Sequence, residues 1–296
     1  MERMEIRLLM QHTYSRLRRQ AESGVTIVEI VIVLTVLAIL APFVFGALND
    51  LYSSNSSSLG ISTQDTDEHS VLGSLNDELV NTTGWGTSLG PVTKPLGPTN
   101  STVTSETWSY CGLNGGSDCT SSTANRVLIA FTSATDKIAS DPTRLPVFTG
   151  AGCDTSQPSI GIIRVAQIYF VAQDPVASYK DLYRRTIVNP DGFTACSGVV
   201  PYQTTTCASS VASNAGCLDT QGHSHTDAIL ITNVSNFTVD YYPTANGAAI
   251  TLPYQATPSQ ITGAKSIKIT VTTQANLNGT LTANTAYVRV TPGNMQ

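Results

Sequence analysis

A single carboxylate, that of Glu29, lies inside a run of apolar residues that extends from Val25 to Phe45. A lone charge in a lipid environment costs on the order of 3 kcal/mol, so Glu29 needs a partner. The small residues Ser23 and Gly24 precede the run, whereas a secretory signal peptide carries its small-residue site after the apolar part. The arrangement therefore differs from that of an ordinary signal peptide.

Three side chains further along the chain, His223, His225 and Asp227, have the types and spacing of an H-x-H-x-D metal loop. Their small and polar neighbours favour instead a polar loop that leads into a strand starting at Ala228. We therefore expect no metal site here, and nothing in the sequence predicts another cofactor.

Other polar clusters also have simple structural interpretations. The acidic group around Glu68 (Asp65, Asp67, Glu68 and His69) lacks the glycine and the distal glutamate of an EF-hand loop. We interpret it as the solvated start of a helical segment, and Arg184 and Arg185 as charges on a strand surface. No nucleophile elbow, zincin motif or phosphate-binding loop is present, so we do not expect an enzyme.

All six cysteines follow the apolar run, which indicates disulfides formed in an oxidising compartment rather than a metal site, because CxxC-like spacing is absent. Cys111 and Cys119 bracket a flexible loop and are predicted to pair with each other. The remaining candidates, whose pairing order stays open, are Cys153, Cys196, Cys207 and Cys217.

The apolar run and its flanks predict the topology. A helix of roughly 20 apolar residues rises about 30 Å, enough to cross a bilayer core. An Arg-rich segment precedes it, which predicts a cytoplasmic N-terminus and an outward C-terminal part. Pro42 is expected to kink the helix, and the weak helix formers Ser53–Ser58 to loosen it.

Beyond the run, apolar residues at helical spacing predict an amphipathic continuation whose apolar side covers a sheet. The pattern consists of Glu68, Val71, Leu72, Leu75, Asp77 and Leu79. Gly84 and Gly86 are predicted to mark its end, and Trp85–Asn125 to be mostly loop.

The C-terminal half predicts short antiparallel strands, with one face against the helix and the other wetter. The candidates are Val127–Phe131, Ile160–Val171, Leu182–Val188, Ala228–Ile231, Phe237–Tyr242, Ala249–Leu252, Ser266–Thr273 and Ala286–Thr291. The alternation of Ile267, Ile269 and Val271 with polar residues is the clearest signal.

The charge balance gives no support for nucleic-acid binding. The chain has a net charge of −5, and removal of residues 1–24 leaves 11 basic and 18 acidic residues. The Arg cluster is better explained by membrane topology than by a nucleic-acid site.

A basic leader ends in Gly24, an apolar residue follows directly, and Glu29 is the fifth residue after Gly24. This arrangement resembles the class III signal of type IV prepilins and pseudopilins. The resemblance implies that a prepilin peptidase cuts between Gly24 and Val25. Val25 stands where the family usually has Phe, so methylation of the new amine is less strongly implied than cleavage. Glu29 matches the family's assembly glutamate, which pairs with the N-terminal amine of a neighbouring subunit.

A second resemblance covers about the last 130 residues. Ile168-Tyr169-Phe170-Val171 followed by Leu182-Tyr183-Arg184-Arg185 is similar to a hairpin of PilW-type minor pilins and J-type pseudopilins. Later strands occur in the same order as in these families, in Asp227–Val234, Ile267–Val271 and Tyr287–Val290. The resemblance implies a minor pilin in preference to a major one.

The expected fold is α+β and pilin-like, a long N-terminal helix packed on an antiparallel sheet. Its parts are a leader (residues 1–24), a transmembrane or filament-core helix (25–45), an amphipathic continuation (46–83) and an extracytoplasmic, disulfide-containing β head (84–296). The expected protein is a minor type IV pilin, first single-pass in the cytoplasmic membrane with its head outside, then in an extracellular or periplasmic filament.

The implied partners are other pilin subunits, prepilin peptidase, and the assembly platform and ATPase. As a minor subunit the protein would prime assembly or cap the tip, and its head would offer the contact surface for adhesion, DNA uptake or secretion cargo. One alternative is a pseudopilin of a secretion or DNA-uptake system. The other is a membrane-anchored extracellular binding or catalytic domain whose anchor stays uncleaved.

Overall fold

The computed structural model describes residues 26–92, 106–110, 112–113, 126–138, 141–149, 161–173, 179–188, 201–209, 223, 225–250, 257–277 and 280–293. Within these ranges the side chains of residues 49, 51–67, 91–92, 106, 112–113, 149, 275–277 and 280 are not described. The chain divides into two compact units, Met1–Ser58 and Leu59–Gln296, which are treated separately.

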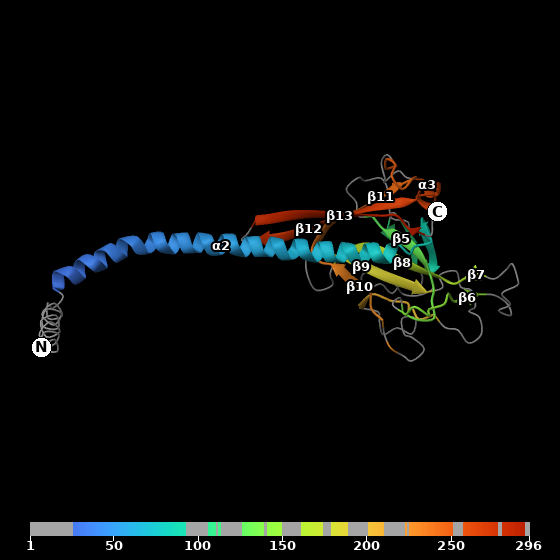
Figure 1. The fold of residues 1–296 in the computed structure, drawn as a ribbon, viewed down its shortest axis with the longest axis horizontal. Coiled ribbons are helices and arrows are strands. Elements are labelled where there is room, and N and C mark those ends of the chain that lie inside the picture. Colours follow the sequence, from blue (N-terminus) through green and yellow to red (C-terminus); the bar gives the residue numbers. More distant parts are fainter. Residues whose placement is uncertain are drawn as a thin grey trace, which may run out of the picture. The chain divides into compact units, whose positions relative to one another are not determined.

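The long helix α2 extends from Ile27 to Leu79 (Figure 1). It continues through Pro42 and also through Ser53–Ser58, so the predicted loosening at the serines is not observed. Serine is only moderately less favourable than alanine in a helix, and intrinsic propensity is a weak influence on a long helix. The predicted kink at Pro42 stays a prediction.

The end of α2 corrects the expected boundary at residue 83. The helix ends at Leu79, and Thr83 already donates its backbone N–H to the carbonyl oxygen of Phe131 at 2.7 Å. The two glycines that were predicted to end the helix belong to strand β1 (Gly84–Gly86). A Cβ on Gly86 would lie 2.7 Å from Ile129 Cγ2, so this glycine is required by close packing of β1 on the sheet.

In the described residues the larger sheet is antiparallel, with strand order β1-β5-β8-β9-β10. The strands after β1 are β5 (Leu128–Ser133), β8 (Arg164–Gln173), β9 (Lys180–Val188) and β10 (Ala228–Ile231). The predicted strand Ala228–Ile231 is confirmed, and β8 and β9 pair antiparallel with Val171 opposite Leu182. The long prediction Ile160–Val171 is divided, because β7 (Gly161–Ile162) pairs instead with β6 (Phe148–Thr149).

A second antiparallel sheet has the order β11-β12-β13. Its strands are β11 (Val234–Tyr242), β12 (Ser266–Leu277) and β13 (Thr280–Val290), and the helix α3 (Pro258–Thr262) precedes β12. Between α2 and β5 lie β2 (Ser88–Val92), β3 (Glu106–Ser109) and β4 (Gly112–Leu113), a small sheet in a region predicted to hold at most short strands.

The predicted strand Ala249–Leu252 is wrong in its described part. Ala249 and Ile250 are not in a strand, although Ile250 donates its N–H to the carbonyl oxygen of Tyr241 at 2.8 Å. Residues 251 and 252 lie outside the described residues. A single backbone hydrogen bond holds Ile250 beside β11 without forming a ladder.

The apolar stripe of α2 covers a shared core, as predicted. Leu72, Leu75 and Leu79 pack with apolar residues of both larger sheets, and Ile267 and Ile269 are fully buried there. In Figure 1 this part of α2 lies alongside β12 and β13. The alternation in β12 therefore has its predicted cause, one face toward the helix and one toward solvent.

The larger sheet differs from the prediction of a wetter second face. One face (Leu128, Tyr169) joins the core under α2, and the opposite face (Ile129, Ile168) packs in a second core with Trp108 of β3. Both faces are therefore buried. The small sheet and neighbouring segments cover a face of the larger sheet that strand periodicity alone predicted to be exposed to solvent.

Candidate functional site

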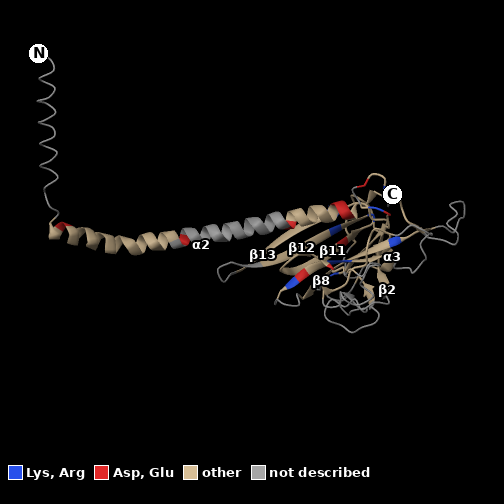
Figure 2. Cartoon of the chain, turned by 90° about the horizontal axis from the view of Figure 1, so that it is seen from below, with Lys and Arg blue, Asp and Glu red and all other residues tan. Residues whose placement is uncertain are grey.

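The first part of α2 exposes a continuous apolar surface. Ile27–Leu48 is long and apolar enough to cross a membrane, and none of it is buried in the described structure. Exposed fractions reach 81 % at Ile27, 73 % at Phe43 and 70 % at Phe45. In Figure 2 this part of the helix is almost free of charged residues. A surface of this kind requires lipid or other protein to cover it, so the segment can act as a membrane anchor or a signal sequence.

Glu29 caps the helix to which it belongs. Its Oε2 accepts the backbone N–H of Thr26 at 2.9 Å and the Thr26 hydroxyl at 3.1 Å, and the Glu29 N–H donates to the Thr26 hydroxyl at 3.3 Å. This is a capping box, in which each residue satisfies a polar group of the other. Oε1 of Glu29 accepts no hydrogen bond from the described residues, so it can still receive a donor from another molecule.

The predicted processing and disulfide residues are mostly outside the described part of the chain. Gly24 and Val25 are not described, and neither are five of the six cysteines. Cys207 is fully buried and disulfide-bonded. The pairing of the cysteines stays a prediction.

The candidate metal loop is engaged by the protein itself. Asp227 accepts two hydrogen bonds from Arg185 Nε at 3.1 Å, one from Arg185 Nη2 at 2.5 Å and one from the Thr206 hydroxyl at 2.9 Å. The carbonyl oxygen of His225 accepts the N–H of Cys207 at 3.0 Å. Among the described residues no group of three His, Cys, Asp or Glu side chains is placed to hold a metal ion.

The interpretation of both arginines as surface charges is wrong for Arg185, whereas the side chain of Arg184 is 33 % exposed. Arg185 is fully buried, its ion pair with Asp227 is nearly inaccessible, and its guanidinium lies 5.4 Å from the ring centres of Trp108 and Phe170. Side chains alternate between the two faces of a strand, so only one of two successive arginines can remain at the surface, and the sequence did not identify the acid that neutralises the inward one.

Arg184 holds the helix to the larger sheet. Its Nη1 lies 2.8 and 2.7 Å from the two carboxylate oxygens of Glu78 on α2, and Gln167 of β8 donates to the same carboxylate at 2.6 Å. Burial opposes the charge of Arg184, but the carboxylate of Glu78 outweighs it and raises the guanidinium pKa. Burial, together with the nearby charge of Glu78, also raises the pKa of Tyr169.

Glu68 corrects the prediction of a solvated acidic cluster. Its side chain is 1 % exposed and accepts hydrogen bonds from the Thr273 hydroxyl and from Asn284 Nδ2, the latter at 2.9 Å. Thr273 and Asn284 are opposite each other on β12 and β13. One carboxylate of α2 therefore joins two neighbouring strands.

Replacement of Glu68 by alanine should lower the free energy of unfolding of the head by about 2 kcal/mol, since the buried Thr273 hydroxyl and the half-buried Asn284 amide lose their acceptor. Glu68→Gln should cost less, because its amide oxygen can still accept a hydrogen bond. Urea unfolding of the full chain in detergent measures both, with the exposed Asp77→Ala on the same helix as control. Equal stability of Glu68→Ala and Asp77→Ala would contradict a linking role.

A scan against protein-family models, a search of curated proteins and a search of solved structures found no match to this chain. Function is therefore inferred from the exposed apolar helix, from Glu29, and from the contacts that hold α2 to the sheets.

Proposed function

We propose that the chain is a minor type IV pilin, a structural subunit that prepilin peptidase processes and that assembles into a pilus or at its tip. One observation carries the proposal: Ile27–Leu48 exposes its large apolar side chains and has one carboxylate, Glu29, in its first turn. A simple anchor needs no such charge. In a subunit that packs beside copies of itself, a paired charge fixes the axial register between neighbouring subunits.

The apolar environment of the helix makes the charge of Glu29 important for the choice between membrane and filament. Lipid tails are as apolar as leucine, so the hydrophobic effect alone does not favour helix association within a bilayer. Packing and polar contacts must supply the preference for a filament over the membrane. A carboxylate paired with an amine in the same apolar layer provides a contact that lipid cannot.

The capping geometry is compatible with this role. Both contacts from Thr26 reach Oε2 of Glu29, which leaves Oε1 to accept a charged amine of a neighbouring subunit. Cleavage after Gly24 would create that amine at Val25. The same carboxylate would then cap its own helix and bind the next subunit.

The head supports the assignment to a minor subunit. Its described residues form three apolar clusters and include a buried disulfide-bonded cysteine, Cys207. It is also large for a shaft subunit that repeats throughout a filament. A head of this kind suits a priming or tip position, where it offers a contact surface for adhesion, DNA uptake or secretion cargo.

N-terminal sequencing of the chain recovered from membranes and from sheared filaments tests the proposal. The expected first residue is Val25, with or without a methyl group. Gly24→Val should block cleavage, because a bulky side chain replaces the last leader residue, and Ser23→Ala should be cut normally. A working protein that still begins at Met1 would instead favour the membrane-anchored extracellular domain.

A further inference from the structure

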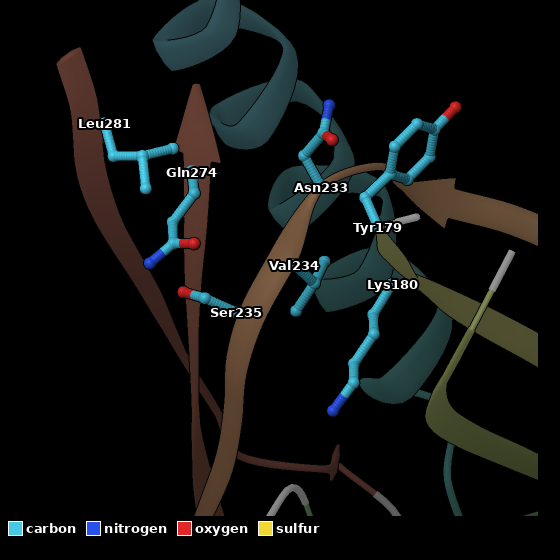
Figure 3. A pocket seen from close by; sticks show the side chains of 7 residues that line it. All are labelled: Tyr179, Lys180, Asn233, Val234, Ser235, Gln274 and Leu281. Atoms are coloured by element: carbon cyan, nitrogen blue, oxygen red, sulfur yellow. The ribbon is translucent and has the colours of Figure 1, made fainter. Parts of the chain in front are cut away.

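A groove of about 490 Å³ opens beside the ends of several strands of the head (Figure 3). Its polar and aromatic lining comes from the start of β9, the start of β11, and from β12 and β13. The lining residues used below are Tyr179, Lys180, Asn233, Ser235, Gln274 and Leu281. The volume lies within the range usual for small-ligand sites.

The groove offers polar groups to a ligand. Within the described part of the chain, the Lys180 ammonium and the side-chain amides of Asn233 and Gln274 make no hydrogen bond or ion pair. The Ser235 hydroxyl donates to the carbonyl oxygen of Thr272 at 3.0 Å, which leaves its oxygen free to accept. The groove therefore offers one positive charge together with neutral donors and acceptors.

Asn233 is held in a conformation that few residues other than glycine adopt. Its φ is 58°, the one positive φ at a non-glycine position among the described residues. The buried carboxylate of Asp181 accepts the Asn233 N–H at 3.1 Å, and the Gln274 N–H donates to the Asn233 carbonyl oxygen at 2.9 Å. Asparagine adopts this left-handed conformation more readily than most side chains do, and the two hydrogen bonds fix the backbone from which its amide projects at the groove.

We propose that this groove binds an acidic saccharide. The amides of Asn233 and Gln274 match sugar hydroxyls, which need both donors and acceptors, and Lys180 matches one carboxylate. The ring of Tyr179, which is 40 % exposed, offers an apolar face at the rim. The proposal does not depend on filament assembly, since every group it uses belongs to the head.

The composition of the groove favours a saccharide over an acidic peptide. Peptide recognition usually depends on buried apolar or aromatic anchors in pockets. Here the apolar side chain of Leu281 is 69 % exposed and forms no such pocket. The single lysine also fits a ligand with one charge per sugar better than a phosphate group, which is usually held by several donors and cations.

Calorimetry with the full chain in detergent micelles tests the proposal, using trigalacturonate, neutral maltotriose and the peptide Asp-Asp-Asp as probes. Trigalacturonate should bind about tenfold more tightly than maltotriose, the contribution of one charge-assisted contact. Added salt should reduce this preference, because the charge of Lys180 is partly screened. The acidic peptide should bind more weakly than trigalacturonate.

Two variants separate the contribution of the Lys180 charge to binding from that of the Asn233 amide. Lys180→Gln should remove the preference for the acidic sugar, and Lys137→Gln, an exposed lysine paired with Asp141, should keep it. Asn233→Gly tolerates the positive φ without strain but lacks the amide, so it should weaken both saccharides about tenfold. Absence of saccharide binding, binding unchanged in Lys180→Gln and Asn233→Gly, or equal binding of Asp-Asp-Asp would overturn the proposal.

Discussion

A chain carrying Glu29→Gln is expected to enter the membrane at the wild-type level and to be about 100-fold scarcer in sheared filaments. The amide oxygen of glutamine can still accept both hydrogen bonds from Thr26, so the helix cap is retained. Only the negative charge is lost. An amine left without its counter-charge in an apolar layer costs on the order of 3 kcal/mol, which corresponds to about a factor of 100 in subunit incorporation.

Two control variants test whether the loss of the Glu29 charge itself causes the expected defect in assembly. Thr26→Ala removes the hydroxyl contacts to Glu29 but keeps the carboxylate, so it should assemble normally. Asp50→Asn makes the same acid-to-amide change at an exposed position of α2 beyond the apolar segment, and it should also assemble. Immunoblots of membrane and sheared fractions give the ratio. Normal incorporation of Glu29→Gln would contradict the assembly proposal.

The elements that the sequence predicts well are those with a local cause. The apolar stripe of α2 and the alternation in β12 follow from side-chain periodicity, and both were found where predicted. The end of α2 was missed because Gly86 was interpreted as a helix stop. The glycine instead meets a packing requirement of Ile129, a residue far along the chain.

The polar contacts of the head could not be predicted for a related reason. Glu68 and Thr273 are 205 residues apart, and Arg185 and Asp227 are 42 apart. A charged residue in an amphipathic pattern is normally assigned to water. Only the folded chain shows that these acids have buried donors. The groove beside Asn233 is likewise formed by residues of several strands, and no local motif marks it.

Arg185→Met should lower the free energy of unfolding of the head by about 3–5 kcal/mol, because it leaves the Asp227 carboxylate buried without its cation. The neighbouring Arg184→Met is the matched control. Its pair with Glu78 is partly exposed, at 33 % and 24 % of the two side chains, so about 1 kcal/mol or less is expected.

The double variant Arg185→Met with Asp227→Asn identifies the cause. Asparagine keeps an oxygen for the Thr206 hydroxyl and removes the unpaired charge, so the double variant should be more stable than Arg185→Met alone. The two tryptophans of the chain, Trp85 and Trp108, are both buried in the head. Their fluorescence during urea unfolding therefore measures the loss of the folded head. If Arg185→Met costs no more than Arg184→Met, or the second change recovers nothing, the buried pair is not what stabilises this part of the head.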